Sequence, residues 1–143
     1  MIIHTKYHGQ MNVKEEQIIL FENGIPGFLE EKQFVILPLS EDSPFVALQS
    51  VTSENLAFIV VSPFIFFKNY EFDLDESTAE LLDIDNIEDV EVMTILTMAE
   101  PFEKSTANLL APIIVNRKNM MAKQVVLHDS SYTTKHPIGG ELC

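Results

Sequence analysis

The apolar run TANLLAPIIVN, residues 106–116, restricts the fold of this chain more than any other stretch. A membrane-spanning helix needs about 20 apolar residues, and Arg117 and Lys118 end this run well short of that length. A buried helix is also disfavoured, because Pro112 would break it, whereas proline is tolerated at the start of a strand. The proline is followed directly by β-branched residues, which favour strands. We therefore predict a strand over Leu110–Val115 that lies deep in the core.

The residues after this run predict its partner strand. The polar residues Asn116–Asn119 are a turn signal, and the chain continues as MMAKQVVLHD, in which apolar and polar residues alternate weakly. Two β-rich runs joined by a short polar loop are typical of a β-hairpin. We predict a hairpin between Leu110–Val115 and Met120–His128, with a loop of about four residues.

Turn signals recur along the rest of the chain with β-rich runs between them, which is the pattern of an all-β domain. Asn23-Gly24 marks a bend. Ile25–Phe28 fits a type II turn, because its proline sets φ at the first central position and its glycine allows φ > 0 at the second. The other predicted strands are Lys14–Phe21, Phe34–Leu39, Phe45–Val51, Leu56–Val61 and Glu91–Met98.

Helix signals are short and local. Ser77-x-x-Glu80 resembles a capping box with a short apolar face behind it at residues 81–84, so we predict a helix beginning at Ser77. A second short turn is predicted near Ile87. The aromatic residues within Pro63–Tyr70 are predicted to belong to the core at one end of the sheet.

Length and composition predict one domain over residues 1–143, with disorder after about residue 137. The hydrophobic content of 46% is ordinary for a globular protein. The N-terminal MIIHTKYHGQ lacks a basic region leading into a long apolar stretch, so no signal peptide is predicted. The one cysteine, Cys143, cannot form an internal disulfide. We therefore expect a cytoplasmic protein that does not enter the membrane.

The net charge of the chain limits the classes of molecule that it is expected to bind. Nine Lys and Arg residues against 22 Asp and Glu residues give a formal net charge of −13, which repels nucleic acid and attracts basic proteins. No Lys or Arg lies between Asn69 and Phe102. Within that gap, ten acids lie between residues 71 and 91: Glu71, Asp73, Asp75, Glu76, Glu80, Asp83, Asp85, Glu88, Asp89 and Glu91. This acidic segment is either a solvated face or a docking surface for a cationic protein, and composition leaves both open.

A search for reaction chemistry finds no candidate. His4 and His8 are predicted to lie in one strand, which separates side chains four residues apart by about 13 Å, and neither a third ligand nor a cysteine pair accompanies them. The sequence also lacks a glycine-rich phosphate loop and a Gly-x-Ser-x-Gly motif. Direct RNA binding is disfavoured, because stacking sites need cationic grooves and Arg117 is the one arginine. We predict a binding module without catalytic, cofactor-binding or metal-binding residues.

Several motifs together resemble the FliW family of flagellar assembly factors, in the order found in that family and over essentially the whole chain. They are GIPGF at 24–28, FVALQS at 45–50, Pro63-Phe64 with Tyr70-Glu71-Phe72, TANLLAPIIVN at 106–116, and QVVL at 124–127 with Tyr132 and His136-Pro137. The resemblance implies a small, closed or nearly closed antiparallel β-barrel with short helical insertions.

The resemblance also implies a non-enzymatic, monomeric regulator. Proteins of this family bind newly made flagellin and, alternatively, the translational repressor CsrA, which they prevent from silencing the flagellin message. CsrA binds RNA and is expected to have a basic surface, which an acidic module suits. The acids could mimic RNA phosphates, or the module could bind beside the RNA site. The resemblance favours the second mechanism, and the sequence leaves both open.

Candidate partner-binding residues lie at the start of the acidic segment and in the 106–116 run: Tyr70, Glu71, Phe72, Asp73, Asp75, Glu76 and Asn108. For Asn108 a local role is the alternative, because asparagine favours capping a turn through its own side chain. Two further classes of function also stay open: a β-barrel that binds a small ligand, and a barrel that binds RNA.

Overall fold

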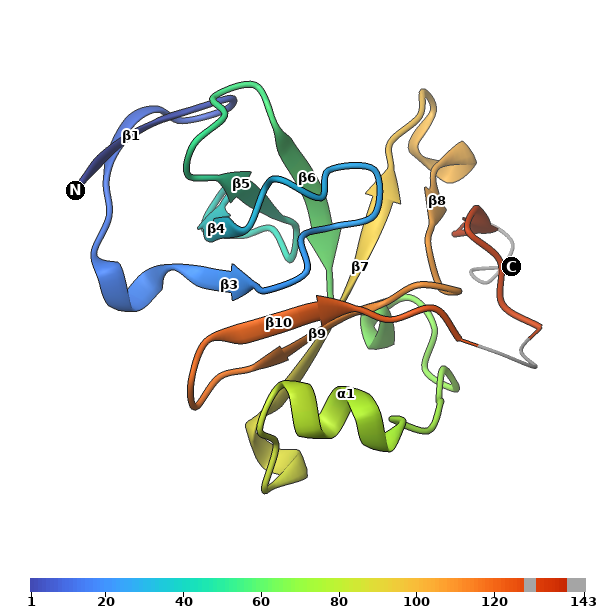
Figure 1. The fold of residues 1–143 in the computed structure, drawn as a ribbon. Helices are drawn as coiled ribbons and strands as arrows, with labels where there is room; N and C mark the ends of the chain where they lie inside the picture. The colour runs from blue at the N-terminus through green and yellow to red at the C-terminus, as the bar shows by residue number, and fades with distance from the viewer. Residues whose placement is uncertain (128–130, 139–143) are drawn as a thin grey trace.

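The structure, a computed structural model, describes residues 1–127 and 131–138 (Figure 1). Its strands are β1 (Ile2–Thr5), β2 (Gly9–Asn12), β3 (Ile19–Phe21), β4 (Gln33–Pro38), β5 (Val46–Ser50), β6 (Ala57–Val61), β7 (Val90–Thr97), β8 (Thr106–Ala107), β9 (Ile113–Asn116), β10 (Met121–Gln124) and β11 (His136–Pro137). Its helical elements are α1 (Glu76–Leu81) and the 3₁₀ helices η1 (Glu15–Gln17), η2 (Pro63–Ile65), η3 (Ile87–Asp89) and η4 (Phe102–Lys104). Within these residues, none of the helices has the length and apolar character needed to span a membrane.

Among the described residues, seven strands form a closed barrel in the order β7-β6-β5-β4-β3-β10-β9, and β9 pairs with β7 again. This confirms the predicted mainly β barrel with short helical insertions. The predicted antiparallel arrangement is confirmed at six of the seven neighbouring pairs; the exception is β3 with β10, which run parallel. A ring with an odd number of strands cannot alternate in direction all the way round, so at least one neighbouring pair must be parallel.

The barrel interior is filled by side chains. Strand residues alternate between the two faces of a sheet, so every second residue points inward. The aromatic rings of Phe21 and Phe34 meet edge to face with centroids 5.3 Å apart. The other buried residues of this interior cluster are Ile19, Ile25, Leu48, Val60, Met93, Ile113, Val115 and Ala122. This packing occupies the volume that a ligand inside the barrel would need.

The outer faces of the barrel are covered by two other parts of the chain. The β1–β2 hairpin packs on β4, where Ile3 and Val13 contact Val35 and Leu37. On another side, the chain between β6 and β7, which includes α1, lies over β7 and β9 (Figure 1). The residues buried there are Val61, Phe67, Tyr70, Leu82, Leu96, Ala107, Leu109, Ile114, Val125, Leu127 and Ile138.

The predicted 110–128 hairpin is confirmed by β9 and β10, with Pro112 directly before β9. The three residues Ile113–Val115 are at most 1% exposed, so this strand is as deeply buried as predicted. The first strand begins at Ile113 rather than Leu110 and ends one residue later than expected, at Asn116, so the four-residue loop shifts to residues 117–120; the second strand is shorter than predicted, Met121–Gln124. His128, the predicted end of the hairpin, lies outside the described residues, as do residues 139–143 of the tail.

The predicted type II turn is confirmed. The Phe28 backbone N–H donates to the Ile25 carbonyl at 2.6 Å, and Gly27 has φ of +90°. Gly24, at the bend before it, has φ of +70°, and a Cβ there would lie 2.4 Å from the Leu29 carbonyl oxygen. Both glycines therefore hold conformations that other residues rarely adopt.

Two predicted strands are wrong in part. Lys14–Phe21 begins as η1 and becomes a strand only at Ile19, because the Gln17 side chain accepts a 2.8 Å bond from the Lys14 backbone N–H and holds a local turn. The stretch from His4 to His8 is not one strand. The Thr5 hydroxyl donates to the Gly9 carbonyl at 2.7 Å, which reverses the chain between β1 and β2.

The predicted start of the helix is also wrong. The N-cap of α1 is Asp75, whose carboxylate accepts bonds from the Thr78 backbone N–H at 3.3 Å and the Thr78 hydroxyl at 2.6 Å. The Ser77 hydroxyl donates to Asp75 instead of capping the helix. Aspartate is as good an N-cap as serine, so the helix can begin after Asp75 instead of after Ser77. The predicted short turn at Ile87 is confirmed by η3.

Candidate functional site

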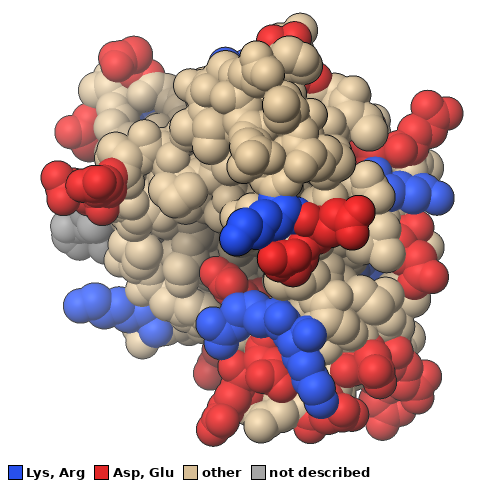
Figure 2. Space-filling view, turned by 90° about the vertical axis from the view of Figure 1, so that its left-hand side faces the viewer, with Lys and Arg blue, Asp and Glu red and all other residues tan. Residues whose placement is uncertain are grey.

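The acidic segment lies at the surface. Nine of its ten carboxylates are exposed, and Asp89 is half-buried. Figure 2, which views the molecule from the left-hand side of Figure 1, shows acidic side chains gathered at the lower end of that side, with Lys and Arg side chains just above them. Lys118 makes a 3.7 Å ion pair with Asp85, and the Arg117 guanidinium donates to the Glu88 carbonyl at 2.9 Å. The loop between β9 and β10 thus offsets the acids near η3.

The chain leading from η2 to β7 borders a hollow of about 360 Å³, called here the apolar hollow. Phe64 and Ile87, at the rim, are 45% and 71% exposed, which is unusual for such large apolar side chains. The lining residues are Phe64, Tyr70, Glu71, Phe72, Leu74, Ile87, Val90, Val92 and Ile114. Glu71 contributes the one ionisable carboxylate of this lining, so the hollow is apolar with an acidic edge.

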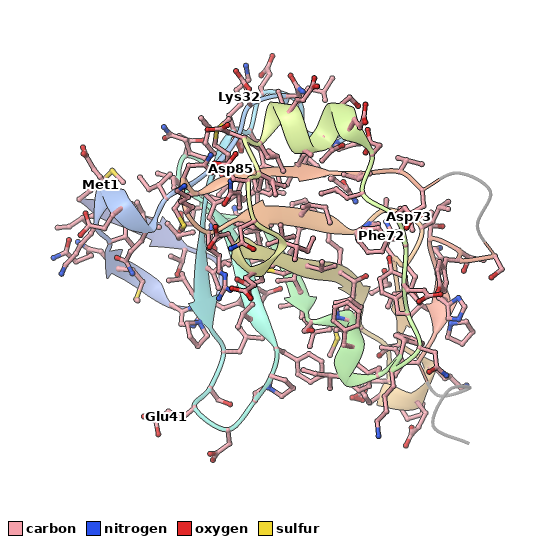
Figure 3. All side chains as sticks on the ribbon, turned by 90° about the horizontal axis from the view of Figure 1, so that it is seen from below. Met1, Lys32, Glu41, Phe72, Asp73 and Asp85 are labelled. Atoms are coloured by element: carbon pink, nitrogen blue, oxygen red, sulfur yellow. The ribbon has the colours of Figure 1, made fainter. Side chains whose placement is uncertain are left out.

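A second, larger hollow of about 800 Å³ lies on the other side of Glu71 and Phe72, and is called here the strand-edge groove. One wall is the extended stretch that leads into α1, on which Figure 3 labels Phe72 and Asp73. The opposite wall is β10 and the residues that follow it. The lining residues are Glu71, Phe72, Asp73, Asp75, Thr78, Lys123, Gln124, Val125, Val126, Leu127, Ser131 and Tyr132.

Tyr70 supports both hollows from beneath. It is 4% exposed, and its ring lies 5.5 Å from Phe72 and 4.6 Å from Tyr132, centroid to centroid. The Tyr132 hydroxyl in turn accepts a 3.2 Å bond from the Glu71 backbone N–H. Burial, with a smaller effect of Tyr132, raises the pKa of the Tyr70 phenol, which therefore stays a hydrogen-bond donor. The Tyr70 side chain is therefore buried and packs against Phe72 and Tyr132, and it is not exposed to a partner.

The structure brings most of the predicted partner-binding residues together. Glu71 and Phe72 line both hollows, whereas Asp73 and Asp75 line the strand-edge groove. The Asp75 carboxylate accepts bonds from the hydroxyls of Ser77 and Thr78, which lower its pKa to about 2, so it carries a negative charge at neutral pH.

Two predicted residues lie outside both linings. Glu76 is exposed in the first turn of α1. Asn108 is half-buried, and its side-chain oxygen accepts a 3.0 Å bond from the Ala111 backbone N–H. Its own backbone N–H donates to Ile95 and its carbonyl accepts from the Thr94 hydroxyl. The structure therefore gives Asn108 the turn-capping geometry that was the alternative for it.

Sequence reasoning missed both the rim of the apolar hollow and the second wall of the groove. Ile87 had a usable signal, since it is an isolated apolar residue within an acidic stretch. The stretch Gln124–Val126 had none, because its residue pattern predicts part of a core strand and its exposure depends on where the neighbouring strand ends.

The structure describes three of the four histidines, His4, His8 and His136. His4 is exposed, and His8 Nε2 lies 2.8 Å from the Pro38 carbonyl oxygen. Among residues 1–127 and 131–138, no three His, Cys, Asp or Glu side chains are grouped to hold a metal ion.

Comparison with known proteins agrees with this fold. The family model described as FliW protein matches residues 2–138. The chain is 97% identical over 143 residues to the flagellar assembly factor FliW of Bacillus subtilis (strain 168), with 100% of both chains covered. It is 53% identical over 136 residues to that of Geobacillus sp. (strain WCH70), covering 95% of this chain and 94% of the relative.

A solved crystal structure of the flagellar assembly factor FliW superposes on this chain with a TM-score of 0.92 at 48% sequence identity. The superposition covers 96% of each chain. The resemblance drawn from the sequence motifs is thereby confirmed: this chain belongs to the FliW family of flagellar assembly factors.

Proposed function

We propose that this protein is a non-enzymatic, cytoplasmic adaptor that binds flagellin and, as an alternative partner, the RNA-binding translational regulator CsrA. By holding CsrA, the adaptor relieves repression of flagellin translation; by holding flagellin, it protects the newly made subunit and releases CsrA. It acts as a monomer. Membership of the FliW family supports a role in flagellar assembly. The main support for protein binding is the apolar hollow, which opens directly beside the acidic segment.

The apolar hollow suits the anchor residues of a protein partner. Phe64 and Ile87 expose large apolar surface at its rim, whereas Val92 and Ile114 lie within its lining. Protein interfaces concentrate their binding energy in such apolar hollows, surrounded by polar residues that exclude water. We assign this hollow to flagellin.

The acidic segment suits the basic partner. A protein that binds RNA presents positive charge, and unneutralised carboxylates attract it over about 8 Å at physiological ionic strength. Such exposed charges act mainly on the rate of association. We assign the start of the segment, from Glu71 to Glu76, to CsrA.

A calorimetric titration with flagellin tests the assignment of the hollow. Changing Ile87 to Ala removes an exposed anchor and is expected to weaken flagellin binding by about 1–3 kcal/mol, the range for an interface hot spot. The matched control is Leu29→Ala, since Leu29 is 63% exposed but lies in the loop between β3 and β4. Equal affinities for wild type, Ile87→Ala and Leu29→Ala would remove the hollow from the flagellin interface.

A competition titration tests the assignment to CsrA and its mechanism. Labelled flagellin leader RNA is bound to CsrA, and this protein is added at increasing concentration. Displacement whose midpoint rises in proportion to the RNA concentration indicates that the acids replace RNA phosphates. Displacement whose midpoint is independent of RNA indicates binding beside the RNA site. RNA that stays bound at saturation would contradict the antagonism altogether.

A further inference from the structure

One wall of the strand-edge groove is the end of β10 and the residues that follow it, which continue to bond to the chain before β9. The backbone N–H groups of Val125 and Leu127 donate to Pro112 and Leu110 at 2.9 and 2.8 Å. Successive residues of an extended chain point their backbone groups to opposite sides. The backbone N–H and C=O groups of the intervening residues, Gln124 and Val126, therefore face away from β9, on the side where β3 pairs with β10, and both residues line the groove.

The neighbouring strand does not extend along this edge. β3 pairs with β10 only at Met121 and Ala122, so the parallel ladder ends before Gln124. Among the described residues, no strand pairs with β10 on this side beyond that point; Gln124, Val125 and Val126 line the groove there, and the Val126 side chain is 50% exposed. An open edge of this kind can accept an extended segment from another chain as an added strand.

The charge of the groove selects the chemistry of that segment. Of the described residues that line it, three are acidic, Glu71, Asp73 and Asp75, and one is basic, Lys123. A second copy of this protein is a poor occupant, because each copy has a net charge of −13 and would repel the other. A segment that carries Lys or Arg between apolar residues would place its charges near the carboxylates and its apolar side chains near Phe72 and Val126.

We propose that the strand-edge groove binds an extended, basic segment of a partner protein, which adds as a strand along Gln124–Val126 opposite the carboxylates of Glu71, Asp73 and Asp75. The stretch from Lys123 to Leu127 has five residues and spans about 13 Å at the usual rise of a strand, so the segment is about five or six residues. The inference rests on the proposed function in one respect, that the partner is a protein. The groove is nevertheless separate from the apolar hollow, and each can be tested alone.

The first test uses two fluorescent peptides, Lys-Val-Lys-Val-Lys-Val and Glu-Val-Glu-Val-Glu-Val, titrated into the full chain. The basic peptide is expected to bind at least about 10-fold more tightly than the acidic one. Hydrogen exchange followed by NMR reports the position: the basic peptide should slow exchange of the Gln124 and Val126 amides, which line the groove, more than that of Val125 and Leu127, which are already bonded. If the bound peptide protects all four amides equally, or protects none of them, the peptide does not add as a strand.

Backbone pairing is tested with two further copies of the basic peptide, each N-methylated on alternate residues. Methylation removes the N–H groups along one edge only, so one copy should lose binding while the other keeps it. Loss of binding in both copies, or in neither, would contradict the proposal. This comparison leaves the protein unchanged and is therefore independent of its folding.

Protein variants test the charge. Asp73→Lys should weaken binding of the basic peptide at least about 5-fold at low salt, whereas Glu41→Lys changes the net charge equally at a site far from the groove (Figure 3) and should have little effect. If both variants lose the same affinity for the basic peptide, the peptide is held by the overall negative charge of the protein and not by the groove. The variant Ile87→Ala should bind the peptide normally, so failure of the flagellin assignment and failure of this proposal give different results.

Discussion

The hydroxyl of Tyr70 donates a 2.7 Å hydrogen bond to the backbone carbonyl of Leu109, which lies 39 residues further along the chain. Both residues are buried, at 4% and 0% exposure. The bond joins the start of the acidic segment to the apolar run before β9. It therefore fixes the stretch on which Glu71 and Phe72 separate the apolar hollow from the strand-edge groove.

Removing this bond should destabilise the protein. Tyr70→Phe keeps the ring but leaves the buried Leu109 carbonyl without this donor, so we expect a loss of about 1–3 kcal/mol in the free energy of unfolding. Urea denaturation measures the loss. The control is Tyr7→Phe, because Tyr7 is 48% exposed and its substitution should change stability by less than about 0.5 kcal/mol. Equal stability of the two variants would show that the Tyr70 bond contributes nothing net.

The cap of α1 should give the protein an acid-sensitive element. The pKa of Asp75 is lowered from 3.8 to about 2 in the folded state, so its charge stabilises the fold above pH 4 and the stabilisation is lost as pH falls through about 2. Asp75→Ala should cost about 1 kcal/mol at pH 7, and this difference from wild type should shrink between pH 4 and pH 2. Urea denaturation across that pH range measures it.

Two variants separate the cap from the charge. Asp75→Asn retains a good capping side chain and should lose less stability than Asp75→Ala at pH 7, while also losing the acid dependence. Ser77→Ala tests the cap predicted from sequence and should cost less than Asp75→Ala. If Ser77→Ala loses more stability than Asp75→Ala, the N-cap of α1 is Ser77 and not Asp75.

Asn108 should act on stability rather than on binding. Its side-chain oxygen holds the Ala111 backbone N–H, so Asn108→Ala is expected to lower the free energy of unfolding by about 0.5–2 kcal/mol while flagellin affinity stays at the wild-type value. Asn108→Asp keeps the acceptor and should retain most of the stability. Calorimetric melting and a flagellin titration give both quantities. Wild-type melting with weakened flagellin binding would instead place Asn108 in the interface.

The acidic segment should steer the basic partner. Changing Glu71, Asp73 and Glu76 to Lys leaves the Asp75 cap intact, and we expect association with CsrA to slow by about 10-fold at low salt. The effect should nearly vanish at 1 M salt, where charges are screened within about 3 Å. Stopped-flow mixing measures the rates.

The control for this prediction is a second triple variant with the same change in net charge. Glu15, Glu41 and Glu54 are exposed acids outside the segment, and their replacement by Lys should slow association much less. If both triple variants slow association equally, the segment has no special role and only the overall charge matters.

The sequence by itself determined much of the local structure of this protein, although not the start of α1 or the turn between β1 and β2. The β class, the β9–β10 hairpin, the burial of Ile113–Val115 and the turn at Ile25–Phe28 followed from short-range rules. Alternation of side chains, the constraint on φ at proline and the freedom of glycine act within a few residues, so they can be read from the order of residues alone. The acidic segment was also visible as a surface feature, because carboxylates without partners stay in water.

The tertiary structure alone decided how those pieces make a site. The parallel pairing of β3 with β10 brings residues about 100 apart in sequence into register, and the length of that overlap leaves Gln124–Val126 as an open edge. The placement of Tyr70 likewise depends on the distant Leu109 carbonyl, and that of the Asn108 turn on hydrogen bonds that join the Asn108 backbone to the Ile95 carbonyl and the Thr94 hydroxyl. Such pairings are chosen by packing and closure of the whole barrel, which no local pattern of residues records.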